Sequence, residues 1–157
     1  MIKMFVPGRG INLELKNLVL DLNGTLSVDG ILIAGVESRI ALLQNHLKIY
    51  LLTSDTLGCG SVIAEGLGIE IFTVGGEQGG QDKLDFVNTL GAEETIVIGN
   101  GYNDRLVLEH AALSILVIGS EGCCATALQK ADIVVKDILD ALDLLFKPMR
   151  IIATLRD

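Results

Sequence analysis

Aromatic side chains are scarce in this sequence, and tryptophan is absent. Aromatic residues make up 4% of the 157 residues, whereas hydrophobic residues of all kinds make up 50%. The core must therefore be built mainly from Leu, Ile, Val and Ala, which suits a parallel sheet flanked by helices. A chain of this length can bury such a core as one domain.

Cysteine and positive charge are scarce as well. Cys59, Cys123 and Cys124 form no Cys-x-x-Cys pair and leave one residue over in any disulfide scheme, so a reducing cytoplasm is the simplest location. The formal net charge of −8 argues against a nucleic-acid backbone or an anionic membrane as partner. No apolar run reaches membrane-spanning length. We therefore expect a soluble, cytoplasmic protein with no nucleic-acid or membrane partner.

Two nucleotide-binding patterns are missing too. The Gly-rich segment at residues 75–80 precedes a Lys but lacks the Gly-Lys-Ser/Thr of a P-loop. No Gly-x-Gly-x-x-Gly follows the first predicted strand, which counts against a dinucleotide-binding fold.

Short apolar segments alternate with helical patterns along the chain. A β-hairpin at a sheet edge is predicted for Ile2–Val6 and Ile11–Leu15, and a small hairpin flap for residues 27–33. We expect further strands at residues 17–22, 48–52, 69–74, 95–98, 114–118 and 133–135, and helices at residues 34–47, 57–66, 83–90, 103–111, 123–130, 138–146 and 148–156. The short connections imply a Rossmann-like, doubly wound parallel sheet of the α/β class. The expected single domain comprises a hairpin (1–16), a core (17–146) and a C-terminal tail helix (147–157).

The predicted strand at residues 17–22 places a carboxylate at its own carboxyl end. An apolar run is followed by Asp21, and then by the turn residues Asn23 and Gly24. Open α/β sheets carry their chemistry at the carboxyl ends of parallel strands, so Asp21 is a candidate catalytic residue. A simple turn cap is the alternative for an isolated Asp after a strand.

Two further segments carry groups suited to phosphate. Thr53 and Ser54 follow the strand at residues 48–52, where a hydroxyl and the following amides can bind phosphoryl oxygens, although either residue could instead cap the next helix. Lys83 begins a predicted helix, where the helix dipole disfavours a cation. Such a local misfit hints at function, with an ordinary solvated side chain as the alternative.

The strand at residues 95–98 leads into a segment rich in oxygen donors. Asn100, Asn103 and Asp104 offer ligands suited to a hard cation such as Mg²⁺. A turn followed by a helix cap would explain the same residues. Together with Asp21 on another strand, however, the segment is typical of a divided metal site.

These four segments together resemble the motifs of the haloacid dehalogenase (HAD) superfamily of phosphohydrolases and phosphotransferases, over residues 18–141. The resemblance implies that Asp21 is a nucleophile that forms an aspartyl-phosphate. It further implies that Thr53 is the hydroxyl of the second motif and that Lys83 neutralises phosphate and nucleophile. Residues 53–55 and 99–104 are most similar to the phosphorylation domain of P-type ATPases, which implies a free-standing relative of that domain.

The resemblance also assigns the remaining site residues. They divide into catalytic residues (Asp21, Asn23, Thr53 and Lys83), phosphate-binding residues (Asn23, Gly24, Thr53, Ser54, Lys83 and Asn103) and ligands of a Mg²⁺ cofactor (Asp21, Asn23, Asn100 and Asp104).

Two positions depart from the pattern of the family's phosphatases. Asn23 stands where they usually carry an Asp that acts as general acid and base, and the loss of such help costs about 10²–10⁴-fold in rate. P-type ATPases also lack an acid there and keep a longer-lived aspartyl-phosphate. Asn100 replaces the first acid of the fourth motif, which predicts weaker metal binding.

The intervals between the motifs leave no room for a cap domain. Without a cap, this chain is similar to those members of the HAD superfamily that act on macromolecules or that close the site with a neighbouring subunit. The resemblance therefore implies a homo-oligomer. We predict a slow Mg²⁺-dependent phosphohydrolase acting on a phosphorylated small molecule or a phosphoprotein. The alternative, supported by Asn23 and Asn100, is a non-catalytic phosphate-sensing or protein-interaction module on the same scaffold.

Overall fold

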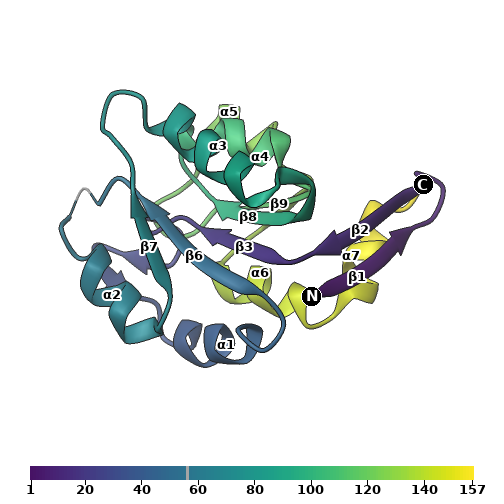
Figure 1. Cartoon of the computed structure of the whole chain (residues 1–157), viewed down its shortest axis with the longest axis horizontal. Helices are drawn as coiled ribbons and strands as arrows, with labels where there is room; N and C mark the ends of the chain where they lie inside the picture. Colours follow the sequence, from purple (N-terminus) through teal and green to yellow (C-terminus); the bar gives the residue numbers. More distant parts are fainter. Residues whose placement is uncertain (56) are drawn as a thin grey trace.

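A six-stranded parallel sheet forms the centre of the computed structural model, which describes residues 1–55 and 57–157 (Figure 1). The strand order is β10-β9-β8-β3-β6-β7. The strands are β3 (Asn17–Leu20), β6 (Lys48–Thr53), β7 (Glu70–Thr73), β8 (Thr95–Gly99), β9 (Leu113–Val117) and β10 (Ile133–Val135). The chain winds outward from β3 to β7 and then returns to the other side of β3. The order therefore reverses beside β3, the place where open α/β sheets bind their ligands.

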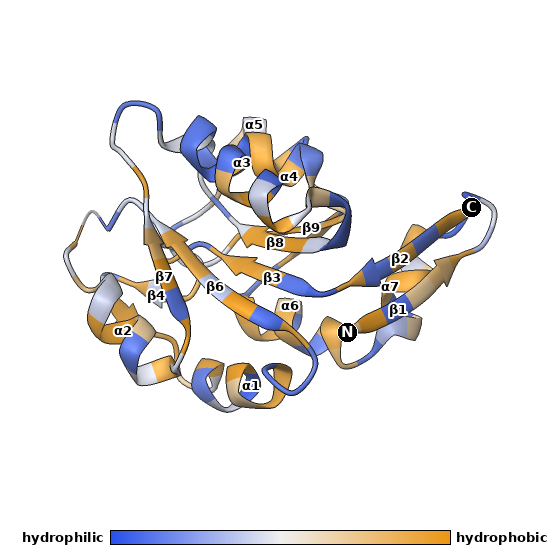
Figure 2. Cartoon of the chain, in the orientation of Figure 1, coloured by the Kyte–Doolittle hydropathy of each residue, from blue (hydrophilic) through white to orange (hydrophobic). Residues whose placement is uncertain are grey.

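Helices cover both faces of this sheet (Figure 1). One layer contains α3 (Gly79–Leu90), α4 (Arg105–His110) and α5 (Ala125–Leu128), and the other contains α1 (Val36–Leu43), α2 (Gly60–Leu67) and α6 (Ile138–Leu145). Alternate residues of β3 enter the two cores: Leu18 and Leu20 pack with the second layer, and Val19 with the first. Figure 2 shows the hydrophobic strands that result. The buried core residues are predominantly Leu, Ile and Val, as the composition predicts.

The N-terminal hairpin forms, but its predicted place at a sheet edge is wrong. Strands β1 (Ile2–Val6) and β2 (Ile11–Leu15) make a separate two-stranded sheet that lies with α7 (Pro148–Leu155) beside the core (Figure 1). One residue separates β2 from β3, and both sides of β3 are occupied by β6 and β8. The hairpin therefore cannot reach an edge of the central sheet, and it buries Met4 and Leu13 in the core instead.

Other boundaries differ from the predicted ones by a few residues. The flap forms as β4 (Ser27–Val28) and β5 (Ile31–Leu32). The helix α3 begins at Gly79 rather than at Lys83, so Lys83 lies one turn inside the helix. Short 3₁₀ helices, Ala92–Glu94 and Tyr102–Asp104, precede β8 and α4. Among the helices of the described residues, none combines the length and apolar character needed to cross a bilayer.

Candidate active site

Three neighbouring strands bring the predicted site residues to the carboxyl edge of the sheet, which is the side where the parallel strands have their carboxyl ends. Asp21 follows β3, Thr53 ends β6, and Asn100 follows β8. Because β6, β3 and β8 are adjacent and parallel, these residues lie at one edge. The fourth element is α3, which carries Lys83.

Lys83 joins two of these segments through its ammonium group. Its Nζ atom lies 2.7 Å from Asp21 Oδ1 and 2.7 Å from Asp104 Oδ1. The side chain of Lys83 is 1% exposed, which is rare for lysine and requires paired charges. The structure therefore brings Asp21, Lys83 and Asp104 together, although 62 positions separate Asp21 from Lys83 in the sequence.

The second oxygen of Asp104 holds the loop after β8. Asp104 Oδ2 accepts hydrogen bonds from the backbone N–H groups of Asn100 at 3.0 Å and Gly101 at 2.9 Å. Gly99 allows this close approach, because a Cβ atom there would lie 2.5 Å from the same oxygen. Both oxygens of Asp104 are thus engaged by groups of the protein itself.

Thr25 is a site residue that the sequence motifs did not single out. Its hydroxyl lies 3.3 Å from Asp21 Oδ2 and 3.2 Å from Asn100 Oδ1, and the side chain is fully buried. With one proton to donate, the hydroxyl serves one of these oxygens at a time. Its position four residues after Asp21, in the same turn, is the signal that could have identified it.

Asn23 presents an unpaired acceptor in the same region. Its Oδ1 atom is buried and has no hydrogen-bond partner among the described residues. A buried acceptor without a donor costs about 1–3 kcal/mol, so such an atom suits a site where a cation or a water completes its contacts. Gly24 follows with φ = 76°, and a Cβ atom at this position would lie 2.3 Å from Asn100 Nδ2. Only glycine fits there.

The oxygen atoms of this region suit a Mg²⁺ ion. Asp21 and Asn100 both contact Thr25, and Asn23 lies in the turn between Asp21 and Thr25, so the three residues are close together. No group of three His, Cys, Asp or Glu side chains with metal-ligand spacing occurs within the described ranges. Mg²⁺ sites typically use one or two carboxylates plus water and substrate phosphate, and Asp21, Asn100 and Asn23 fit such a site. Asp104 fits it less well, because both of its oxygens are already engaged: Oδ1 by Lys83 and Oδ2 by the Asn100 and Gly101 N–H groups.

Thr53, Ser54 and Asn103 flank these groups. Thr53 Oγ1 accepts a hydrogen bond from the Asp55 N–H at 2.9 Å, and Asp55 in turn accepts from the Gly60 N–H at the start of α2. Ser54 and Asn103 line a hollow of about 620 Å³ whose wall also includes the Gly-rich loop. The structure thus places Thr53 at the end of β6, where it holds the turn that follows, and Ser54 and Asn103 in the wall of this hollow.

Burial and neighbouring charges shift the pKa values of Asp21 and Lys83. Desolvation raises the pKa of Asp21, the nearby Asp104 carboxylate raises it further, and Lys83 opposes both; the result is a pKa of about 6. Burial alone would lower the pKa of Lys83, but the Asp104 and Asp21 carboxylates overcome this effect and hold its pKa above the ordinary value. Lys83 is therefore an ammonium, and Asp21 gains its proton only in mild acid.

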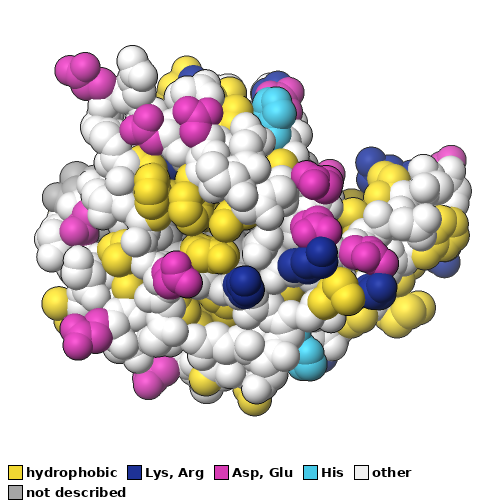
Figure 3. Space-filling model, in the orientation of Figure 1, with side chains coloured by type: hydrophobic (Ala, Val, Ile, Leu, Met, Phe, Trp, Pro, Cys, Tyr) yellow, Lys and Arg dark blue, Asp and Glu magenta, His cyan; other side chains and the backbone are white. Residues whose placement is uncertain are grey.

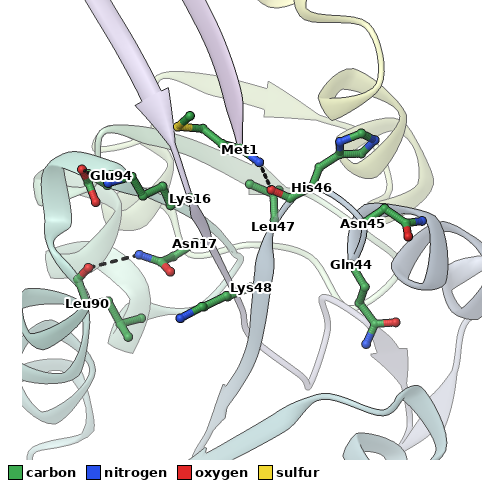
Figure 4. A pocket seen from close by; sticks show the side chains of 10 residues that line it. All are labelled: Met1, Lys16, Asn17, Gln44, Asn45, His46, Leu47, Lys48, Leu90 and Glu94. Carbon is green, nitrogen blue, oxygen red and sulfur yellow. Dashed lines mark hydrogen bonds and ion pairs between the residues drawn. The ribbon is translucent and has the colours of Figure 1, made fainter.

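A second hollow lies at the opposite edge of the sheet. It has a volume of about 480 Å³, and its wall includes Lys16, Lys48, Asn17 and Glu94 (Figure 4). Figure 3 shows side chains of both charges gathered where the core meets the hairpin. Lys16 Nζ lies 2.6 Å from Glu94 Oε1, and both side chains are substantially exposed. This hollow lies at the amino ends of the strands, away from Asp21.

Comparison by sequence finds short relatives. The uncharacterized protein MJ0073 of Methanocaldococcus jannaschii is 54% identical over 65 residues, which are 41% of this chain and 70% of that protein. The uncharacterized protein MJ0072 of the same organism is 44% identical over 39 residues, which are 25% of this chain and 89% of that protein. The chain belongs to the family of these proteins. No family model matches it.

Comparison by structure finds phosphatases. The 3-deoxy-D-manno-octulosonate 8-phosphate phosphatase of Moraxella catarrhalis, solved with magnesium, phosphate and the sugar acid, superposes with a TM-score of 0.67 at 20% identity, covering 91% of this chain and 94% of that one. The cobalt-bound phosphatase YrbI of Haemophilus influenzae gives 0.69 at 16% identity, covering 85% and 88%. This chain has the HAD fold. The catalytic domain of the CPx-ATPase CopB-B shares the HAD fold, with a TM-score of 0.60 at 22% identity over 73% of this chain and 46% of that one.

Proposed function

We propose that this protein is a Mg²⁺-dependent phosphohydrolase that works through an aspartyl-phosphate on Asp21. The observation that carries the proposal is Lys83, buried between Asp21 and Asp104 at 2.7 Å from each. Burying three charges costs desolvation, and apolar side chains of similar volume often stabilise a fold as well or better. A buried ammonium beside a carboxylate at the reactive edge of the sheet is therefore better explained by chemistry than by stability.

The chemistry requires Asp21 to be ionised. Its pKa of about 6 leaves it a carboxylate at neutral pH. In the first step, an Asp21 oxygen forms a bond to phosphorus while the bond from phosphorus to the leaving oxygen breaks. Asn23 cannot supply a proton, so the leaving oxygen takes one from water. In the second step, water attacks phosphorus, the bond from phosphorus to Asp21 breaks, and the proton that the water loses goes to solvent, which leaves inorganic phosphate and free Asp21.

The other residues stabilise charge in both steps. Lys83 and Thr53 offset the charge that develops on the phosphoryl oxygens, as preorganised donors do in phosphoryl transfer. Ser54, Asn103 and the backbone around Gly24 bind the phosphoryl group. A Mg²⁺ ion, when bound by Asp21, Asn23 and Asn100, would supply Lewis-acid polarisation of a phosphoryl oxygen. Asp104 joins these ligands only if one of its oxygens gives up its contact with Lys83 or with the Asn100 and Gly101 N–H groups.

The structural neighbours support this proposal at the level of reaction class. The phosphatases from Moraxella catarrhalis and Haemophilus influenzae are named for a phosphorylated sugar acid, and their structures hold magnesium or cobalt. A phosphorylated small molecule is accordingly the favoured substrate class, with a phosphoprotein as the alternative.

We further expect copies of the chain to associate through the flap, where the apolar side chain of Ile31 is 74% exposed. Sedimentation measures this association.

Trapping of the phosphoenzyme tests the proposed mechanism. The purified protein is incubated with Mg²⁺ and a ³²P-labelled small phosphate donor, quenched in acid, and treated with hydroxylamine, which cleaves acyl phosphates. We expect an acid-stable, hydroxylamine-labile label on the wild type and on Asp140→Asn, a matched control at an exposed position, and none on Asp21→Asn. If the wild type remains unlabelled and releases no phosphate, the non-catalytic phosphate-sensing module takes the place of the enzyme.

A further inference from the structure

The hollow beside the phosphate residues is larger than a phosphoryl group needs. Its volume is about 620 Å³, within the range of small-molecule pockets. Ser54 and Asn103 in its wall are the chain neighbours of Thr53 and Asp104, so this part of the hollow adjoins the proposed phosphate site. The rest of the wall consists of the loop and helix start at residues 75–81, together with Tyr102, Arg105 and Leu106. This is where the organic part of a phosphate ester would lie.

Arg105 is the basic residue in this wall, and two contacts orient it. Its Nη1 donates a hydrogen bond to the Tyr102 carbonyl oxygen at 3.0 Å. Its guanidinium carbon lies 3.8 Å from the centroid of the Tyr102 ring. The guanidinium also lies next to α3, since a Cβ atom at Gly80 would be in ordinary van der Waals contact with Nη1, at 3.4 Å. An arginine held by stacking and a hydrogen bond keeps its remaining donors oriented for a planar or tetrahedral anion.

The charges around Arg105 leave its guanidinium available. No ion pair joins Arg105 to a carboxylate in the described part of the chain. Asp82, near the loop, accepts a hydrogen bond from the Gly75 N–H at 3.0 Å. Glu77 is the carboxylate in the wall itself, and it is exposed to solvent. It is the internal group that would compete with a ligand for Arg105.

We propose that Arg105 determines substrate specificity by binding a second anionic group on the part of the substrate that leaves with the ester oxygen. The substrate class is then a phosphomonoester with a carboxylate or a second phosphate a few bonds from the reacting phosphorus. This inference rests on the proposed function, since it names the substrate class of the same site. The site would contain two cationic subsites, Lys83 for the transferred phosphoryl group and Arg105 for the distal anion.

A matched substrate series tests this assignment. Glycerol 3-phosphate carries one anionic group, 3-phosphoglycerate adds a carboxylate, and glycerol 1,3-bisphosphate adds a phosphate. Charge-assisted hydrogen bonds are worth roughly 1.5–3 kcal/mol, so kcat/KM of the wild type should favour at least one two-anion substrate by about 10- to 100-fold. Arg105→Gln should erase most of this preference, and Arg105→Lys should restore part of it. The control Arg9→Gln, in the exposed turn of the N-terminal hairpin, should keep the preference in full.

Two results would overturn the assignment. One is a wild type with equal kcat/KM on all three substrates, and the other is an Arg105→Gln variant that lowers all three values equally. Glu77→Gln should increase the preference, because it removes the competing carboxylate, and a decrease would count against Arg105. Whichever two-anion substrate is preferred identifies the distal group as carboxylate or phosphate.

Calorimetry separates failure of this inference from failure of the proposed function. Asp21→Asn protein, with and without Arg105→Gln, is titrated with the same three compounds, so that binding is measured without turnover. If no substrate is hydrolysed and no phosphoenzyme forms, the phosphohydrolase proposal fails. Tighter binding of a two-anion compound that requires Arg105 would still support the subsite, and equal binding of all three compounds would overturn it.

Discussion

The two edges of the central sheet carry lysine–carboxylate pairs of almost equal length in opposite surroundings. At the carboxyl edge, Lys83 lies 2.7 Å from both Asp21 and Asp104. At the amino edge, Lys16 lies 2.6 Å from Glu94 (Figure 4). The side chain of Lys83 is 1% exposed, whereas that of Lys16 is 49% exposed. The N···O distance is therefore almost the same in the two ion pairs, and what distinguishes them is how far their side chains are buried.

This difference supports the carboxyl edge as the proposed catalytic site. Water solvates Lys16 whether or not Glu94 is present, and it screens their attraction. Lys83 has lost its water and depends on two carboxylates, and the same desolvation raises the pKa of Asp21 to about 6. Perturbed groups of this kind gather at functional sites. The hollow at the amino edge has a volume similar to that of the hollow beside Ser54 and Asn103, but its lysine side chains are exposed to solvent.

Replacing each lysine by methionine should show the largest contrast between the edges. Lys83→Met leaves two buried carboxylates without their cation, so we expect a loss of about 3–5 kcal/mol in the free energy of unfolding. Lys16→Met removes a solvated pair and should leave the urea midpoint nearly unchanged. Circular dichroism during urea unfolding measures both. Equal losses for the two variants would show that burial does not separate the edges.

Asn23→Asp sharpens the comparison by adding an acid to the buried edge. If Asn23 stands where a proton donor is needed, the variant should turn over faster by about tenfold or more. The added carboxylate also lies near Asp21, and repulsion raises one of the two pKa values, which suits a donor that must hold a proton near neutral pH. Phosphate release from an aryl phosphate at saturating Mg²⁺ measures this change. Unchanged turnover, with the phosphoenzyme equally persistent, would argue that proton transfer is not limiting.

The pH dependence should come from the carboxyl edge alone. In the proposed mechanism Asp21 must be ionised to attack phosphorus, so kcat/KM should fall in acid by about tenfold per pH unit, and bound Mg²⁺ should move this fall below the pKa of about 6 that Asp21 has without metal. The substrate should be an aryl phosphate whose own second pKa lies well below 6. Asp21 also binds its proton more tightly when folded than when unfolded, so its contribution to stability is present in acid and is lost as pH rises through 6. Asp21→Asn should remove that part of the stability profile, and an identical profile in the variant would contradict the raised pKa.

The smallest expected effect is that of salt on the stability differences caused by the two lysine substitutions. Salt should remove the difference at the amino edge and leave that at the carboxyl edge unchanged. At about 1 M NaCl the Debye length is about 3 Å, so any small difference between wild type and Lys16→Met should disappear. The loss caused by Lys83→Met should persist, because a buried pair is screened far less. Urea unfolding at low and high salt measures both differences. A Lys83→Met loss that also vanished in salt would mean that water reaches the Lys83 pair.

Local pattern in the sequence was sufficient for the order of the elements. Apolar runs such as the one before Asp21 alternate with helical spacing, and the period of side chains along a strand or helix is a property of the chain itself. The ends of these strands also identify Asp21, Thr53 and Asn100 as residues of one edge, because parallel strands bring their carboxyl ends together. The sequence alone also shows that position 23 carries an amide, Asn23, in place of the acid that the family's phosphatases usually have there.

Tertiary structure alone decided which of these groups touch. Lys83 reaches Asp21 because α3 packs against the sheet with that side chain turned inward, a contact across 62 positions that no local period encodes. Thr25 joins Asp21 to Asn100 only because the turn folds back over the end of β8. The hairpin was predicted correctly in its strands and wrongly in its place, since the neighbours of β3 are set by long-range pairing. Burial follows from packing, and it is burial that makes Lys83 differ from Lys16.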